Sequence, residues 1–293
     1  MWQAAHVATL LRQSHSGLEV ELVPMVTQGD RIQDRSLAAI GGKGLFIREL
    51  EVALEEQRAD MAVHSMKDLP GDLPEGLVIG AVLERADPHD ALVAANAARL
   101  DDLPRGVRVG TSSLRRQAQL LAARPDLRIE PLRGNVDSRL RRFDAGELDA
   151  IVLACAGLIR LGLESRITAR IDTAICLPAV AQGVIGIECR ASDERVLQLL
   201  SALNHPATRI VMDAERAFAH RLGGSCQSPI AAHARLEGEA LILEGLVAEP
   251  DGSRLLRDRQ SGSVGHPAAL GSLLAERMLA AGAGLLLDRL RAG

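Results

Sequence analysis

The sequence has very few aromatic residues: one Trp, three Phe and no Tyr among 293 residues. A site built on stacking of bases or sugar rings against aromatic side chains is therefore not expected. Lysine is also scarce, because Lys43 and Lys67 are the only two and the other cationic residues are Arg. The small acidic surplus gives a net charge of -4, which argues against a general nucleic-acid-binding protein.

The sequence also lacks the signals of a membrane or exported protein. No uninterrupted apolar run reaches the ~18–20 residues that span a bilayer, and no export signal is recognisable at the N-terminus. No metal site is expected, because no CxxC pair and no His at zinc-ligand spacing occurs among Cys155, Cys176, Cys189 and Cys226. We expect a cytoplasmic protein of two or three domains.

Strands and helices alternate over the first two thirds of the chain. Strands are predicted at 17–25, 59–63, 77–83, 107–110, 127–132 and 149–154. Helices are predicted at 44–56, at 114–123 and in the segment that Gly146 closes. This alternation is typical of parallel sheets with helices on both faces, in which ligands bind at the carboxyl ends of the strands.

The last third of the chain has a different pattern. Helices are predicted at 194–203, 208–222 and 268–280, and three consecutive strands at 230–236, 240–247 and 254–260. Consecutive strands with little helix between them favour a small antiparallel sheet covered by helices, which is a separate α+β domain.

Arginines follow the ends of three successive predicted strands. Arg115 and Arg116 fall in the first turn of a helix capped by Ser112 or Ser113, where the helix dipole disfavours cations. Such a pair suggests an anionic ligand, which guanidinium groups bind well. Each arginine alone is also compatible with a solvated surface. Together with Arg133, Arg139 and Arg160, the pair predicts a polyanion site.

Three further residues are candidates for chemistry. Asp68 follows Lys67 in a loop closed by Pro70, where a carboxylate among cations stays ionised and can stabilise a positive charge, although such a pair is also common on surfaces. His64 beside it is a structural histidine or a catalyst. Cys226 lies in a Gly-rich turn that makes a thiol accessible. The alternatives are an enzyme with a covalent group on Cys226 and a two-domain solute-binding protein.

Seven segments in this order resemble the porphobilinogen deaminase family, also called hydroxymethylbilane synthases. They are VTQGD (26–30), GGKGLFIRELE (41–51), AVHSMKDLP (62–70), GTSSLRRQ (110–117), LRGNVDSRL (132–140), LPAVAQGVIGIECR (177–190) and GGSCQSPI (223–230). The resemblance implies an α/β fold with two periplasmic-binding-protein-like domains of type II. Domain 1 is discontinuous, with residues 1–83 and 184–201, and domain 2 covers 89–179. A small α+β domain 3 covers 206–293 and holds a three-stranded antiparallel sheet.

The resemblance also implies the reaction. A dipyrromethane cofactor is attached to Cys226 through a thioether, four porphobilinogen molecules are added head to tail with loss of ammonia, and water releases hydroxymethylbilane. Asp68 is the implied catalytic carboxylate, which would stabilise the electron-poor cation left when ammonia departs. The implied protein is a monomer whose product passes to uroporphyrinogen-III synthase.

Further residues are implied to bind the carboxylates of the pyrroles, since each pyrrole carries an acetate and a propionate. The implied cofactor-binding residues are Ser65, Lys67, Thr111, Ser112, Ser113, Arg115, Arg116, Arg133, Gly134 and Gln182. The implied substrate-binding residues are Arg115, Arg116, Arg139 and Arg160. Movement of the domains and of the 41–44 loop is expected as the chain of pyrroles grows.

The sequence departs from the family pattern at its start. Family members carry a strand and a TRxSxLA-type segment before the residues that match Trp2, Gln3 and Ala4, whereas Met1 directly precedes Trp2 here. We expect the true start to lie upstream. The alternatives are a truncated, inactive or cofactor-poor family member and a reversible anion-binding protein.

Overall fold

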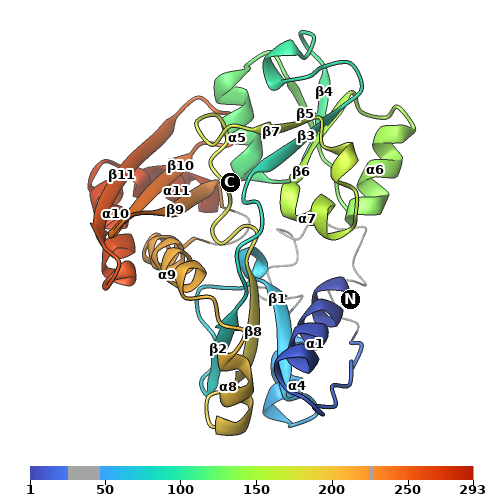
Figure 1. The fold of residues 1–293 in the computed structure, drawn as a ribbon. Coiled ribbons are helices and arrows are strands. Elements are labelled where there is room, and N and C mark those ends of the chain that lie inside the picture. The colour runs from blue at the N-terminus through green and yellow to red at the C-terminus, as the bar shows by residue number, and fades with distance from the viewer. Residues whose placement is uncertain (26–46, 225–227, 293) are drawn as a thin grey trace. The chain divides into compact units, whose positions relative to one another are not determined.

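The computed structural model describes residues 1–25, 47–224 and 228–292. The chain divides into two compact units, one of Met1–Arg85 with Val184–Ile210 and one of Ala86–Gly183 with Val211–Gly293. Three sheets are found in the described part, one in the first unit and two in the second (Figure 1). The VTQGD segment, the 41–44 loop and Cys226 lie outside the described residues.

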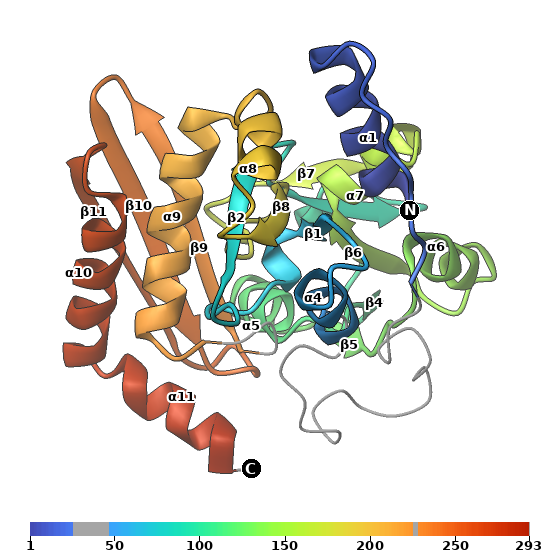
Figure 2. The ribbon, with the colours of Figure 1, turned by 90° about the horizontal axis from the view of Figure 1, so that it is seen from below.

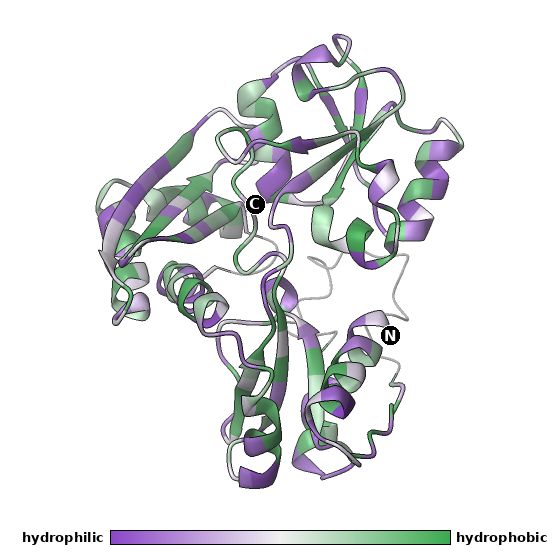
Figure 3. Cartoon of the chain, viewed as in Figure 1, coloured by the Kyte–Doolittle hydropathy of each residue, from purple (hydrophilic) through white to green (hydrophobic). Residues whose placement is uncertain are grey.

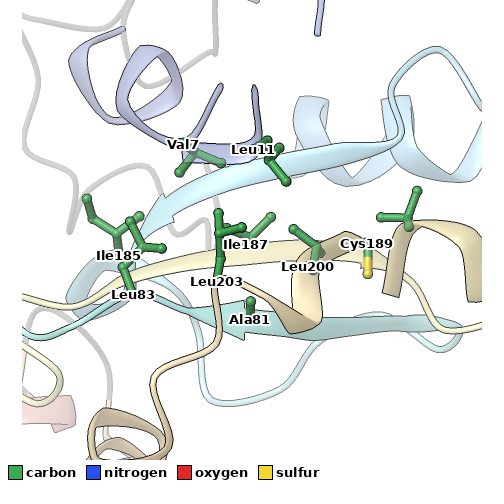
Figure 4. Packing of buried hydrophobic residues seen from close by; sticks show 10 residues of the cluster. Val7, Leu11, Ala81, Leu83, Ile185, Ile187, Cys189, Leu200 and Leu203 are labelled. Carbon is green, nitrogen blue, oxygen red and sulfur yellow. The ribbon is translucent and has the colours of Figure 1, made fainter. Parts of the chain in front are cut away.

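The first unit is built on a three-stranded sheet in the order β1-β8-β2. Its strands are β1 (Met61–Ser65), β2 (Leu77–Val82) and β8 (Ile185–Arg190). Helices α1 (Trp2–Ser14) and α8 (Glu194–Ser201) cover one face, and Figure 4 shows the apolar side chains that meet there. Helix α4 (Arg48–Glu55) packs on the other face through Leu54, which contacts Ala62 and Leu77.

Two expectations for the first unit are wrong. Both strand pairs of the described sheet are antiparallel, because the central strand β8 runs opposite to β1 and to β2. Strand β8 follows Val184, where the chain returns to the first unit. Residues 18–25 form no strand, although Leu18 and Val20 pack against the core. An alternating pattern of apolar residues indicates that one side of a segment is buried. It does not show that a second strand lies beside the segment to form hydrogen bonds with it.

The second unit contains a five-stranded sheet in the order β5-β4-β6-β3-β7. The strands are β3 (Asp90–Ala94), β4 (Arg108–Gly110), β5 (Arg128–Glu130), β6 (Ala150–Ala154) and β7 (Ala169–Ile171). Strand β4 is parallel to β5 and β6, as expected, whereas β3 is antiparallel to β6 and β7. The sheet is therefore mixed, and the expectation of a parallel sheet holds only for its β5-β4-β6 part.

Each parallel strand of this sheet leads into a helix. These are α5 (Leu114–Ala123), α6 (Val136–Asp144) and α7 (Cys155–Arg160), and short 3-10 turns occur at Leu100–Asp102 and Glu164–Arg166. Helix α5 covers one face through Leu120, and α6 and α7 cover the other through Leu140 and Leu158. Figure 3 shows the contrast between the hydrophobic β6 and the largely hydrophilic α6. Helices on both faces of an α/β sheet are thus confirmed.

The rest of the second unit is an antiparallel sheet in the order β11-β10-β9, as expected. It comprises β9 (Ile230–Glu237), β10 (Ala240–Ala248) and β11 (Leu255–Ser263), with helices α9 (Pro206–Arg221), α10 (Pro267–Ala280) and α11 (Ala283–Ala292). Figure 2 shows α9 and α10 side by side over this sheet. Phe218 of α9 is fully buried against Gly245, and Gly271 of α10 lies against the backbone of Ala214.

The expected domain ranges can be compared with the two units. Residues 1–83 and 184–201 lie within the first unit, and residues 89–179 lie within the second. Residues 206–293 lie in the second unit from Val211 onward. The division of the chain into three domains stays a prediction.

No single helix of the described residues has the length and apolar character to cross a membrane, although α10 and Ala283–Leu290 have both together as a bent pair. No group of three or more His, Cys, Asp or Glu side chains in the same residues could hold a metal ion.

Gly245→Ala tests the packing of α9 on β10. The new methyl group would collide with the Phe218 ring, so we expect a loss of about 1–3 kcal/mol in the free energy of unfolding, measured in urea. Gly284→Ala is the control, because its methyl group would meet only Leu279, at 3.6 Å, and alanine favours helix. Equal unfolding of Gly245→Ala and wild type would contradict this packing.

Candidate carboxylate and anion-binding sites

Asp68 lies at the end of a short turn that continues β1. The turn is a 3-10 helix, Met66–Asp68, and the Met66 N–H donates to the Val184 carbonyl at 3.0 Å. The Met66 side chain is buried against Gly186 of β8, so the turn is fixed to the sheet. Asp68 itself is exposed, and its carboxylate forms no hydrogen bond or ion pair with any residue that the structure describes. It is therefore open to a ligand.

Ser65 precedes this turn, and Lys67 lies within it. The Ser65 hydroxyl accepts a hydrogen bond of 2.7 Å from the Gln3 amide of α1. Gln3 was not singled out from the sequence, since an isolated Gln in an amphipathic helix carries no recognisable pattern. The structure thus brings together three of the expected site residues of the first unit: Ser65, Lys67 and Asp68.

The second unit holds a fully buried carboxylate, Asp90, at the start of β3. Arg115 Nη1 donates to Oδ2 at 2.7 Å, and Arg116 donates to Oδ1 from Nη2 at 2.7 Å and from Nε at 3.0 Å. The Gln182 amide also donates to Oδ1 at 3.0 Å, and the Cys176 thiol donates to Oδ2 at 3.2 Å. Asp90 therefore ties α5 to β3 and to the 176–182 segment.

The protonation states in this cluster follow from its charges. Burial by itself would raise the pKa of Asp90, but the attraction and hydrogen bonds of Arg115 and Arg116 hold that pKa well below its usual range. Burial, reinforced by the charge of Asp90, raises the pKa of the Cys176 thiol to about 12. Asp90 is therefore ionised, and Cys176 is a neutral donor rather than a nucleophile.

Arg115 and Arg116, whose place at a helix start suggests an anionic ligand, both pair with an anion of the protein itself, Asp90. Ser113, rather than Ser112, caps α5, because its hydroxyl accepts from the Arg116 N–H. Whether the two arginines also bind a ligand stays a prediction.

One carboxylate does not neutralise two guanidinium groups. The cluster of Asp90, Arg115 and Arg116 carries one surplus positive charge, and both arginines are about 95 % buried. Arg115 Nε is buried and has no hydrogen-bond partner among the described residues. Backbone carbonyls of Leu177 and Val152 also accept hydrogen bonds from these two guanidinium groups, and the surplus charge is compatible with the prediction that they bind an anion.

Arg160, at the end of α7, is a second cation that has no counter-ion among the described residues. Its Nη2 donates to the Gly183 carbonyl at 2.7 Å, and burial lowers its pKa with no opposing effect from a carboxylate. No acidic side chain of the described residues pairs with it. These observations are compatible with the prediction that Arg160 binds a carboxylate, which guanidinium groups bind well.

The remaining expected residues of the second unit lie at the ends of β4 and β5. The Thr111 hydroxyl is buried and accepts from the Ser113 N–H at 3.2 Å, whereas Ser112 is exposed. Arg133 is exposed beyond β5. Gly134 follows at a φ of 103°, which favours glycine, and accepts a hydrogen bond from Arg139 Nε at 2.8 Å.

Gln182 was expected to contact the cofactor. It is 1 % exposed, and its amide nitrogen donates to Asp90 and, at 2.7 Å, to the Pro88 carbonyl. These two bonds hold Gln182 beside Pro88 and Asp90. Asp90 was missed because a single Asp before an apolar run fits a loop as well as a buried strand end.

Two family models match nearly the whole chain. The model described as "Porphobilinogen deaminase, dipyromethane cofactor binding domain" matches residues 1–198, and "Porphobilinogen deaminase, C-terminal domain" matches 210–280. The chain belongs to the porphobilinogen deaminase family. Among its curated relatives, the porphobilinogen deaminase of Xanthomonas campestris pv. campestris is 56 % identical over 99 % of this chain and 95 % of its own length. That of Xanthomonas axonopodis pv. citri is 55 % identical over the same shares.

Solved structures of low sequence identity were also found. A periplasmic substrate-binding protein of an ABC transporter from Coxiella burnetii is 18 % identical, with a TM-score of 0.42, over 71 % of this chain and 89 % of its own. The methionine-binding protein MetQ is 17 % identical, with a TM-score of 0.44, over 68 % and 84 %.

Asp90→Asn tests the buried cluster. Removing the carboxylate leaves two buried guanidinium groups without their partner, so we expect a loss of about 3–5 kcal/mol in the free energy of unfolding at pH 7, measured in urea. Because folding lowers the pKa of Asp90, its contribution is complete above the unfolded pKa, near 4, and is lost as the pH falls below that value.

The control is Asp149→Asn, which removes the exposed ion pair with Arg108 and should have a much smaller effect. The difference between wild type and Asp90→Asn should shrink below pH 4. An equally small effect of both substitutions at pH 7 would contradict the role of Asp90.

Proposed function

We propose that this protein is a hydroxymethylbilane synthase. It joins four porphobilinogen molecules head to tail, with loss of one ammonia for each, and water then releases hydroxymethylbilane. The observation that carries the proposal is the match of both family models, one of them the cofactor-binding domain, along residues 1–198 and 210–280. Identity of 55–56 % to curated porphobilinogen deaminases over almost the full chain supports it.

The charges of the second unit suit such a substrate. Each porphobilinogen brings an acetate and a propionate, so the growing chain gains two negative charges with every unit. The surplus charge of the Asp90 cluster and the unpaired Arg160 supply cations that the described residues do not neutralise. Guanidinium groups bind carboxylates through two parallel hydrogen bonds, which suits an oligomer of acidic pyrroles.

The same donor set fits a dipyrromethane cofactor, which also carries acetate and propionate groups. When attached to Cys226, this group supplies the free pyrrole carbon to which the first porphobilinogen is joined. The residues proposed to hold its carboxylates are Arg115, Arg116 and Arg133, with Ser65, Lys67, Thr111, Ser112, Ser113, Gly134 and Gln182 as further cofactor-binding residues; Arg139 and Arg160, with Arg115 and Arg116, are proposed to bind the substrate. Buried Arg115 Nε, which has no partner among the described residues, supports this assignment.

Asp68 is the proposed catalytic carboxylate. Its exposed carboxylate can accept hydrogen bonds from pyrrole N–H groups and can stabilise the cation left when ammonia departs. It can also hold the proton that makes ammonia a good leaving group. The fixed turn after β1 supports this role, because electrostatic stabilisation is strongest when the charge needs no rearrangement.

The wider setting belongs to the same proposal. We propose that the protein acts as a monomer in the cytoplasm and that uroporphyrinogen-III synthase takes up the product.

Cys226→Ser tests the covalent tether. We expect the purified variant to lack bound pyrrole, because a serine hydroxyl is a much weaker nucleophile than a thiolate, and to release no ammonia from porphobilinogen. The measurement is the colour that acid-denatured protein develops with a pyrrole-reactive aldehyde. Cys189→Ser, at a buried position in β8, is the control and should keep its pyrrole. Normal pyrrole colour in Cys226→Ser would refute the tether.

Asp68→Asn tests the catalytic carboxylate. The amide keeps the shape of the side chain and loses its charge, so we expect kcat to fall by about 100-fold or more, with KM for porphobilinogen changed much less. Asp72→Asn, in the same connection between β1 and β2, is the matched control. Turnover of Asp68→Asn within about twofold of wild type would remove Asp68 from the mechanism.

A further inference from the structure

The first unit contains a buried carboxylate that the proposed mechanism does not use. Glu188, in the central strand β8, is 0 % exposed, and its Oε2 lies 2.8 Å from Nε2 of His64, which is 6 % exposed. Its other oxygen, Oε1, is buried and has no hydrogen-bond partner among the described residues. Apolar side chains of similar size often stabilise a protein at least as well as a buried polar pair, so this pair calls for a role beyond stability.

The pair lies next to the Met66–Asp68 turn, because His64 precedes this turn by two residues. Ala62 is opposite Glu188 and His64 is opposite Gly186 in the β1–β8 ladder, so the side chains of His64 and Glu188 meet diagonally on one face of the sheet. His64 precedes Asp68 by four residues on the same strand and turn. On this face of β8, Glu188 is hydrogen-bonded to His64 and Gly186 packs against Met66. These two contacts hold the end of β1 and the start of the turn on β8.

Helix α4 closes this face and brings further charges to it. Glu51 of α4 is affected by the pair: burial and the charge of Glu188 raise its pKa, and the charge of His64 opposes this rise. Glu55 and Arg48 of α4 act on Glu51 as well. Arg190 of β8 donates to the Leu54 carbonyl at the end of α4, which fixes the helix over the pair.

We propose that Glu188 and His64 are positioning residues for the reaction. Their hydrogen bond fixes the last residues of β1 and so sets the place of the Met66–Asp68 turn and the direction of the Asp68 carboxylate. This inference rests on the proposed function. It adds to that function two buried residues that do not touch the substrate and act through Asp68.

The test is the double substitution His64→Leu/Glu188→Leu. It removes both polar side chains together and leaves neither without its partner, so the protein should unfold at the same urea concentration as wild type or at a higher one. We expect kcat to fall by about 10-fold or more and KM for porphobilinogen to change by less than about twofold, because the carboxylate is misplaced and the binding arginines are intact.

Two further variants separate positioning from general stability. Glu188→Gln keeps a hydrogen bond to His64 and should restore most of kcat. Ile187→Val changes the opposite face of the same strand, should lower stability by removing one methylene, and should keep kcat. A folded double variant with kcat within about twofold of wild type would overturn the proposal, and so would Glu188→Gln as inactive as the double variant.

A second readout separates this proposal from the proposed function. Crystal structures of wild type and the double variant should differ in the place of Asp68 relative to β8, and an unmoved Asp68 would overturn the positioning role. If wild-type protein released no ammonia from porphobilinogen, the proposed function would fail, and this structural comparison would still decide the positioning role.

Discussion

The second unit depends on one buried carboxylate. Asp90 receives hydrogen bonds from Arg115, Arg116, Gln182 and Cys176, and so connects a helix, a strand and the returning chain through a single side chain. An uncompensated charge in such a place would be strongly destabilising, which fixes where these groups lie. The cluster also holds more positive than negative charge, and this supports the proposal that Arg115 and Arg116 bind an acidic ligand.

In the first unit, the candidate for catalysis is a negative charge, the carboxylate of Asp68. This side chain is exposed and unpaired among the described residues, whereas the strand behind it is held by the buried Glu188–His64 pair and by Met66 on Gly186. Loss of ammonia from a protonated aminomethyl pyrrole leaves a cation, which a fixed negative charge near that carbon stabilises. The carboxylates of the growing chain call for positive charges. In the proposed reaction, Asp68 of the first unit would supply the negative charge and arginines of the second unit would supply the positive charges.

The sequence predicts what depends on local pattern and motif. Helix α5 and the three antiparallel strands β9–β11 have the expected places, because apolar periodicity and caps are encoded within each segment. Family motifs point to Asp68, Cys226 and the arginines. Pairings between distant segments were missed: the antiparallel places of β3 and β8, Asp90 under Arg115, and Glu188 beside His64. Each joins residues at least 25 positions apart, and no local pattern specifies such a partner.

The central claim is that an acidic pyrrole chain grows on the protein while it remains attached. The most direct measurement is the intact mass of the native protein, quenched in acid after mixing with limiting amounts of porphobilinogen. The account predicts a ladder of masses, each step equal to one porphobilinogen minus one ammonia, that returns to the starting mass as hydroxymethylbilane is released. A protein that consumes porphobilinogen without any such ladder, or that binds it reversibly with no gain in mass after acid, would contradict the account.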